Sequence, residues 1–368
     1  MDPIAHTLTG GALAAAGLKR AAPLATAALL IGANAPDVDV VAYFGGDYAS
    51  LAHRRGWTHG VLALVLWPFI ITGALLALDR WRRRSRPDLE RARAGPLLGV
   101  STIAVLTHPT LDWLNNYGMR WLMPFDGRWF YGDALFIIDP WVWLVLGGVL
   151  FLAYSAKPAH VAAWSLFAVA ASALVLTTDE VPTASRVLWL VGLAGFAAAR
   201  LAGVDGSARP RTVARAAAVA LCAVGAYMAS SLLANFPARA EVRAVLERAG
   251  VEDIGNIMIG PMPADPFAGQ VVAETRDAYY TGRWHWLAAP RFEPSPEPIP
   301  KNDGGPIVEA ARAAPSASRY LVWSRFPYFQ IESAGDGGHI VQIDDARYPD
   351  ARLGGVIVRL DENLEPLP

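Results

Sequence analysis

The sequence predicts a polytopic α-helical membrane domain over residues 1–235, followed by a small α+β extracytoplasmic domain over residues 236–368. Two observations lead to this prediction. Apolar segments follow one another up to residue 235, and the composition changes abruptly after it. The overall composition agrees, since 54% of the 368 residues are hydrophobic and 18% are charged. Such a chain is too apolar for an average soluble protein and too charged to lie wholly in a membrane.

The first two apolar segments, residues 4–18 and 21–35, are shorter than the ~20 residues that span a bilayer. We expect them to form a tilted or re-entrant helical hairpin that turns at Lys19 and Arg20. The predicted membrane spans are residues 61–78, 96–112, 141–154 with an extension back through 134–138, 159–176, 187–201 and 213–234. Each segment alone fits a buried helix of a soluble protein, but their succession favours a membrane domain.

The distribution of basic residues predicts how this domain is oriented. Lysine and arginine cluster at residues 19–20, 80–93, 157 and 200–215. The positive-inside rule places these turns in the cytoplasm. We therefore expect a multi-pass protein of the cytoplasmic membrane, in which the opposite helix ends and the C-terminal domain lie outside.

One polar stretch between two apolar segments has the composition of a metal site. Residues 36–59, PDVDVVAYFGGDYASLAHRRGWTH, contain Asp37, Asp39, His53 and His59. Pro36 stops the preceding helix and lets the two carboxylates leave the backbone near each other. Imidazole nitrogen and carboxylate oxygen together suit zinc and similar divalent ions. A single aspartate could instead cap a helix or lie in a solvated turn, but the cluster favours metal binding.

A second pair of candidate ligands lies in LTHPTLDWLNNYG. His108 and Asp112 are four residues apart, so on a helix their side chains lie on one face, one turn apart. The predicted orientation brings His108 and Asp112 to the same side of the membrane as residues 36–59. His6 joins them, because its helix runs from that side to Lys19.

The ordered set AHTLTG, APDVD, HRRGWTHG, THPTLDWLNNYGMRWLMPF and IIDPWVW resembles the YdjM-like family of membrane-bound, metal-dependent hydrolases, up to about residue 155. The resemblance implies an integral membrane protein with hydrolase activity. It also implies that the motif positions are His6, Asp37, Asp39, His53, His59, His108 and Asp112. A looser similarity in motif order links the chain to zinc-dependent phospholipase C enzymes. The chain departs from the family pattern at Gly60, where serine is common.

Three further residues are candidates for catalysis. Arg54 and Arg55 could clamp a phosphate group bidentately, although a solvated arginine or a headgroup contact is an equal alternative. Asp139 abuts the next span and could act as a general base, an additional ligand or a partner of a ligand. Tryptophan and tyrosine side chains bracket the same region, as in an interfacial belt.

The predicted function is metal-assisted hydrolysis with one or two divalent ions, for which zinc suits the candidate ligands. Seven candidate ligands exceed the three protein ligands of a single catalytic zinc site, which favours a binuclear site. The site's place at the membrane boundary predicts membrane lipids as partners and a lipid or lipid-phosphate substrate. The net charge of −1 says nothing about nucleic acid, but the sequence has no RNA- or DNA-binding motif, so no nucleic-acid partner is expected. Two alternatives are a structural metal with a partner-binding outer domain and, less favoured, a transporter.

The C-terminal residues predict an α+β domain of unspecified role. Helices are expected over residues 238–249 and 306–314. Strands are expected near residues 257–259, 270–274, 284–287, 328–333, 339–342 and 355–360. The proline-rich residues 292–305 are expected to form a loop or edge linker.

Overall fold

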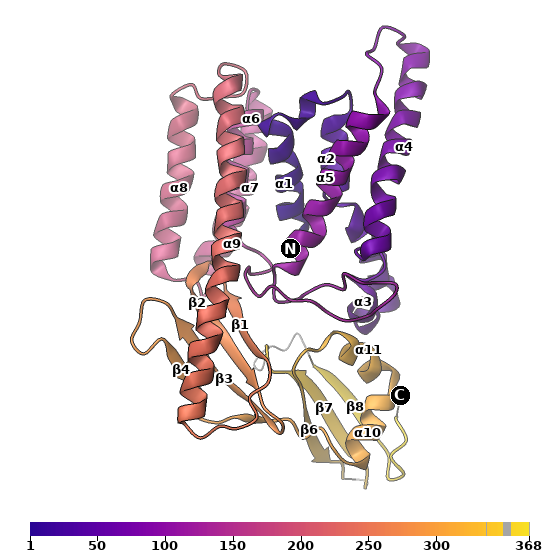
Figure 1. Ribbon diagram of the computed structural model, residues 1–368, viewed down its shortest axis with the longest axis vertical. Helices are drawn as coiled ribbons and strands as arrows, with labels where there is room; N and C mark the ends of the chain where they lie inside the picture. The colour runs from indigo at the N-terminus through magenta and orange to yellow at the C-terminus, as the bar shows by residue number, and fades with distance from the viewer. Residues whose placement is uncertain (336, 349–354, 368) are drawn as a thin grey trace. The chain divides into compact units, whose positions relative to one another are not determined.

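The computed structural model describes residues 1–335, 337–348 and 355–367 and divides into two compact units. The helical unit comprises Met1–Val38, Arg55–Leu233 and Pro261–Pro266, and the sheet unit comprises Asp39–Arg54, Ala234–Gly260 and Phe267–Pro368. The predicted fold class is confirmed, because apolar helices in the N-terminal part precede two small antiparallel sheets (Figure 1).

The helical unit is built from apolar helices. They are α1 (Pro3–Ala16), α2 (Ala25–Gly32), α4 (Val61–Ser85), α5 (Ala94–Trp113), α6 (Pro140–Tyr154), α7 (Pro158–Thr177), α8 (Thr183–Leu201) and the first part of α9 (Pro210–Arg248). Six helical segments of the described chain are long and apolar enough to cross a membrane, and α6 is a shorter apolar helix. The 3₁₀ segments η1 (Leu18–Arg20) and η2 (Ala35–Gly45) flank α2.

Two apolar cores hold these helices together. One core lies among α1, α2, α4 and α5, and the other joins α1 and the end of α5 to α6, α7, α8 and α9. Small residues let the helices approach closely. A Cβ atom on Gly10 would lie 2.6 Å from the carbonyl oxygen of Leu29, and one on Gly32 would lie 2.7 Å from Cβ of Ala104. Close backbone contact of this kind is typical of helices packed in a membrane.

The structure differs from the sequence prediction at two helix boundaries, one at the start of α6 and one within α9, whose last part belongs to the sheet unit. Residues 134–138 do not extend α6, because Asp139 caps the helix and Pro140 begins it. The helix predicted at residues 238–249 is the continuation of α9, which passes through Pro237. The residues after Pro237 sustain the helix because Ala238, Val242 and Leu246 are buried in a core against the first sheet.

The sheet unit contains two separate sheets. The first has the order β1-β2-β3-β4, with β5 also paired to β3. Its strands are β1 (Ile257–Met262), β2 (Asp265–Glu274), β3 (Ala278–His285), β4 (Phe292–Pro294) and β5 (Ile299–Pro300). The second has the order β6-β7-β8, with β6 (Pro327–Ser333), β7 (His339–Asp345) and β8 (Val356–Leu360). Helices α3 (Asp47–His53), α10 (Pro306–Ala313) and α11 (Pro315–Trp323) complete the unit.

Two details of the sheet unit differ from the sequence prediction. The proline-rich residues 292–305 contain the short strands β4 and β5, which pair with β3 rather than forming only a loop. The strand predicted at residues 284–287 begins earlier, at Ala278, and ends at His285. Tyrosine, threonine and glycine at residues 279–282 are less apolar than the tryptophan-rich stretch that follows, which explains the error.

Candidate metal centre

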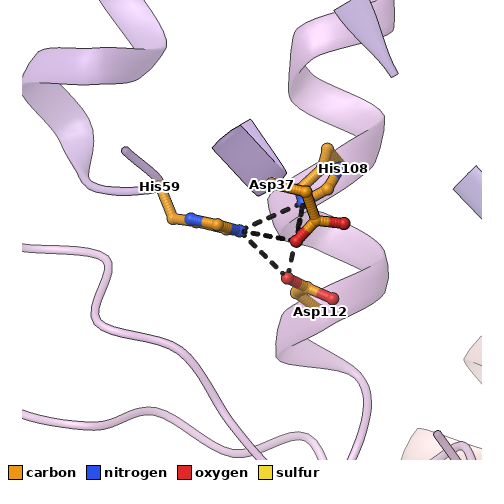
Figure 2. Close-up of side chains that lie close together, drawn as sticks. All are labelled: Asp37, His59, His108 and Asp112. Carbon is orange, nitrogen blue, oxygen red and sulfur yellow. Dashed lines mark hydrogen bonds and ion pairs between the residues drawn. The ribbon is translucent and has the colours of Figure 1, made fainter. Parts of the chain in front are cut away.

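Four side chains from three segments of the helical unit meet in one place (Figure 2). Asp37, His59, His108 and Asp112 each direct a ligand atom to the others, and these atoms all lie within 4.8 Å of one another. His108 and Asp112 occupy the last two turns of α5, as their spacing predicts. Asp37 lies at the start of η2 and His59 lies in the loop before α4.

The Nε2 atoms of His59 and His108 lie at the centre of the cluster. Nε2 of His59 lies 3.1 Å from Nε2 of His108. Oδ2 of Asp112 lies 3.3 Å from Nε2 of His59 and 3.5 Å from Nε2 of His108. Oδ1 of Asp37 lies 3.9 Å and 3.8 Å from the same two nitrogens.

Contacts on the far side of each ring orient the two imidazoles. The carbonyl oxygen of Ala33 lies 2.8 Å from Nδ1 of His108, and a carbonyl can only accept. A neutral His108 therefore carries its proton on Nδ1 and presents the lone pair of Nε2 to the cluster. Oγ1 of Thr58 lies 2.9 Å from Nδ1 of His59 and holds that ring in place, with the hydroxyl able to donate or accept. Such partners are a regular feature of histidines that bind metals.

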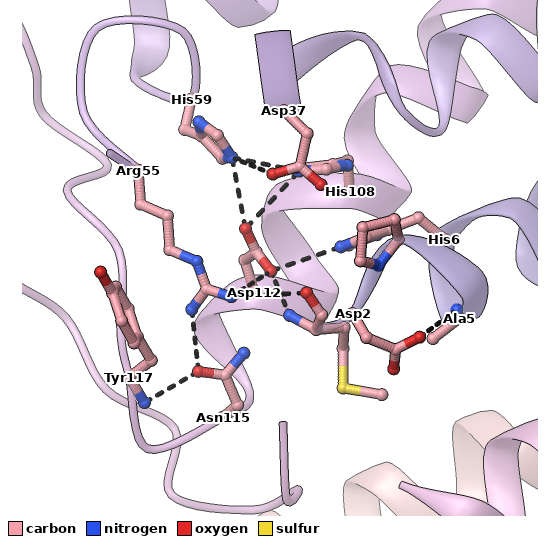
Figure 3. A network of polar contacts seen from close by, with 12 residues as sticks. Asp2, Ala5, His6, Asp37, Arg55, His59, His108, Asp112, Asn115 and Tyr117 are labelled. Atoms are coloured by element: carbon pink, nitrogen blue, oxygen red, sulfur yellow. Dashed lines mark hydrogen bonds and ion pairs between the residues drawn. The ribbon is translucent and has the colours of Figure 1, made fainter. Parts of the chain in front are cut away.

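A polar network holds the other side of Asp112 (Figure 3). Oδ1 of Asp112 pairs with the guanidinium of Arg55 at 3.0 Å and with the amino group of Met1. Arg55 is buried and also donates to Oδ1 of Asn115 at 3.0 Å, while its guanidinium lies 4.4 Å from the ring centre of Tyr117. The two oxygens of Asp112 thus have separate partners, and Oδ2 faces the histidines.

His6 lies at the edge of the cluster. Its ring is buried and stacks on that of His108, with 3.8 Å between ring centres and 16° between planes. Nε2 of His6 is 3.4 Å from Oδ1 of Asp112, and neither ring nitrogen makes a hydrogen bond within the described part of the chain. His6 is therefore a further buried side chain that could bind a metal ion, next to the group of four.

The remaining ligand candidates lie in the sheet unit. Oδ1 of Asp39 is 3.5 Å from Nε of Arg54, which also donates to the hydroxyl of Tyr43 at 3.1 Å. His53 is exposed at the end of α3. The group of four does not include Asp39 or His53, and their predicted metal binding stays a prediction.

Two of the predicted catalytic residues have structural contacts. Arg55 binds the buried Asp112 rather than pointing to open space. Asp139 caps α6 by accepting from the N–H groups of Trp141 and Val142, and the hydroxyl of Tyr227 donates to it at 3.0 Å. Burial raises the pKa of Asp139 to about 6, while these hydrogen bonds oppose the rise. These contacts lend no support to the predicted catalytic role of Asp139.

Sequence reasoning missed the residues that support the ligands. Thr58 and Asn115 lie close in the chain to His59 and Asp112, but a hydroxyl or an amide group alone does not indicate that a residue supports a metal ligand. The carbonyl of Ala33 is invisible to sequence patterns, because any residue provides the same oxygen. Proximity to a ligand in the chain was the one available clue for Thr58.

The donor set fits a divalent metal ion. Zinc bound at about 2.0–2.2 Å by four ligands places neighbouring ligand atoms about 3.4 Å apart. The five separations given above run from 3.1 to 3.9 Å. Two imidazole nitrogens and two carboxylate oxygens are also a suitable ligand set for such an ion.

The fold and this cluster define a multi-pass membrane protein with a candidate site for a divalent metal ion. The model of the YdjM inner membrane protein family matches residues 1–181, and through this N-terminal part the chain belongs to that family. The predicted family is thereby confirmed, and the protein is a multi-pass inner membrane protein.

One curated relative is the uncharacterized protein YfhP of Bacillus subtilis (strain 168), which is 26% identical over 117 residues. The match covers 32% of this chain and 33% of the relative, so the chain spans about a third of that protein's length. No solved structure matches the chain significantly.

Proposed function

We propose that this protein is a membrane-embedded, metal-dependent hydrolase acting on an ester or phosphoester of a lipid or lipid-linked substrate. The observation that carries the proposal is the set of two imidazole nitrogens and two carboxylate oxygens at one end of α5, three of them on buried side chains. Zinc suits this set best. His6 adds a donor 3.4 Å from Asp112, so the site has donors for one or two ions.

Asp37, His59, His108 and Asp112 would hold the ion. When bound, a divalent ion activates water at neutral pH and polarises the oxygen of an ester or phosphoester. Arg55 keeps Oδ2 of Asp112 turned toward the histidines by binding Oδ1. The Asp37 side chain is 15% exposed whereas those of the three other ligands are fully buried, so we expect a substrate to approach past Asp37.

The place of the cluster supports a lipid substrate. His108 and Asp112 end a 20-residue apolar helix, and a helix of that length crosses the hydrocarbon core. The ligands therefore belong at the depth of lipid headgroups and ester bonds. We propose the extracytoplasmic face, because the basic turns belong on the cytoplasmic side.

A structural metal is a second candidate, favoured by one observation. Three of the four ligand side chains are fully buried, and four protein ligands can close a site that lacks an open position. In that case the sheet unit would carry a partner-binding function and the ion would stabilise the helices.

Metal analysis combined with an activity screen separates these functions. The full chain, purified in detergent, is analysed for metal, then stripped with a chelator and reloaded with zinc. Each form is assayed for hydrolysis of phospholipids and lipid phosphates. Hydrolysis that is lost and regained with zinc supports the hydrolase. Bound metal with an altered melting temperature but no hydrolysis favours the structural role, and a metal-free protein after supplementation overturns both.

The proposed orientation has its own test. Alkaline phosphatase fused to the C-terminus is active only outside the cytoplasm, whereas green fluorescent protein becomes fluorescent only in the cytoplasm. We expect phosphatase activity from the fusion at the C-terminus and from one in residues 36–59. Phosphatase activity from a fusion in residues 80–93 instead would reverse the orientation.

A further inference from the structure

A second polar cavity lies at the opposite end of the helical unit from the metal cluster. It has a volume of about 410 Å³ and is lined by residues of η1, by Asp79 and Arg82 of α4, and by the segments that precede α2 and α5. Arg93 precedes α5 and Asp112 lies near its end, so the helix separates the cavity from the metal cluster by about 28 Å. The cavity is thus near the second membrane boundary, at the upper end of α4 and α5 in Figure 1.

Four cations line this cavity: Lys19, Arg20, Arg82 and Arg93. In the described part of the chain, no ion pair involves any of them. Lys19 contacts the ring of Tyr154, with Nζ 5.5 Å from the ring centre.

Two acidic residues also line the cavity, and they do not cancel this charge. Asp79 is buried and already binds Arg83 at 3.1 Å. Glu90 is exposed in the loop before α5. Four cations against two carboxylates leave an excess of positive charge at the cavity wall.

The backbone adds to this positive field. Helix α2 begins at Ala25 and α5 begins at Ala94, and neither first turn has a side-chain cap. The residues preceding them, Leu24 and Arg93, both line the cavity. Helix N-termini carry a partial positive charge that favours an anion, although the N–H of Ala25 already donates to the carbonyl of Ala22 and Pro96 has no N–H. These helix ends accompany the four side-chain cations and act in the same direction.

We propose that this cavity binds a phosphate group, with Arg82 and Arg93 as its main side-chain donors. Its volume lies within the range of about 300–1,000 Å³ that holds small ligands. Arginine forms paired hydrogen bonds with phosphate oxygens, and basic pockets between helices at the cytoplasmic boundary suit anionic headgroups. The phosphate can belong to an anionic phospholipid of that leaflet or to a free phosphate ion. This site is separate from the proposed hydrolase centre.

The test compares two doubly substituted full-length proteins with the native protein. Arg82→Gln/Arg93→Gln removes two lining cations, whereas Arg84→Gln/Arg86→Gln removes two exposed cations at the C-terminal end of α4 that do not line the cavity. Binding of phosphatidylglycerol is measured by native mass spectrometry of protein released from phosphatidylcholine nanodiscs that contain a minor share of it. Binding of inorganic phosphate to the detergent-solubilised proteins is measured by calorimetry.

We expect Arg82→Gln/Arg93→Gln to weaken binding of one of the two probes at least about tenfold more than the control pair does. An effect on phosphatidylglycerol alone identifies a lipid headgroup, and an effect on inorganic phosphate identifies a free ion. Equal losses in both variants would mean diffuse attraction to the basic loop and would overturn the site. No loss in either variant, or no binding of either probe, would overturn it as well. Unchanged metal content in the cavity variant keeps this outcome distinct from the fate of the hydrolase proposal.

Discussion

His59 and His108 face each other with 3.1 Å between their Nε2 atoms, although 49 positions separate them in the chain. Two imidazole nitrogens lie at such a short distance either when one donates a hydrogen bond to the other or when both bind one ion. The carboxylate Oδ2 of Asp112 within 3.5 Å of both nitrogens favours an ion, because it supplies the negative charge that a cation requires.

The His59→Ala/His108→Ala variant tests the cluster directly. We expect bound transition metal to fall from about one or two equivalents to near zero, because two of the four donors are lost. Elemental analysis of the detergent-purified protein measures the change. His160→Ala is the matched control, since this exposed histidine lies outside the cluster and contacts the carbonyl of Tyr154. Equal metal in native and doubly substituted protein would refute the site.

Arg55 and Arg54 are neighbours in the chain with different partners, and substituting each one tests whether Arg55 positions a metal ligand. Arg55→Gln removes the guanidinium that holds Oδ1 of Asp112, so we expect zinc affinity to fall about 10–100-fold. Arg54→Gln removes a side chain that pairs with Asp39 near the surface, and we expect a change within about fivefold. Competition with a chromophoric chelator measures both affinities.

The conservative variant Arg55→Lys separates positioning from folding. Lysine keeps the charge next to Asp112 but loses the second donor that reaches Asn115. We expect partial recovery of zinc affinity at an unchanged melting temperature. If Arg54→Gln and Arg55→Gln weaken zinc binding equally, Arg55 does not position the ligand.

The sequence predicted local relationships well and long-range ones only in part. The four-residue spacing of His108 and Asp112 sets them on one face of α5 by helix geometry alone. Whether Asp37 or Asp39 joins them depends on how η2 meets α5, which involves contacts between distant segments. Residue type could not decide this, because both aspartates offer the same carboxylate. The structure brings Asp37 to the histidines and pairs Asp39 with Arg54.

Arg55 illustrates a further limit of sequence reasoning. A guanidinium binds a phosphate and a carboxylate equally well, so the sequence pattern could not show that the carboxylate of Asp112 binds the guanidinium of Arg55. The course of α9 is a similar case. Pro237 is a reasonable place to end a helix, but apolar residues on the following turns are buried and hold the helix together. Burial that depends on another element overrides a local signal.

Gly60 provides a third test and explains the departure from the family pattern. A Cβ atom at this position would lie 2.2 Å from the carbonyl oxygen of Met123, a backbone atom that cannot rotate away. We expect Gly60→Ser to displace the loop that carries His59 and to lower zinc affinity or the melting temperature measurably. Gly127→Ser is the control, because a Cβ atom there meets no heavy atom within 4 Å. Wild-type zinc affinity and melting temperature in Gly60→Ser would show that the loop tolerates a side chain.

Asp139 provides a test of pH dependence. Burial raises the pKa of its carboxyl from 3.8 to about 6 in the folded protein. Between these two pH values the folded state holds a proton that the unfolded state has released, so stability falls as pH rises. The difference between the two pKa values corresponds to about 3 kcal/mol of unfolding free energy, and this stability is fully lost above about pH 6. Asp139→Asn keeps a capping oxygen for α6 but cannot ionise.

We therefore expect the melting temperature of Asp139→Asn to rise relative to the native protein as the pH increases from about 4 to 6. Differential scanning fluorimetry of the detergent-purified proteins at matched ionic strength measures this. Asp126→Asn is the control with the opposite sign. Hydrogen bonds from the backbone and side chain of Arg128 lower the pKa of Asp126, so its contribution is lost only as pH falls below its ordinary range. A native protein that gains stability relative to Asp139→Asn as pH rises would contradict the burial of an ionisable carboxyl at this helix cap.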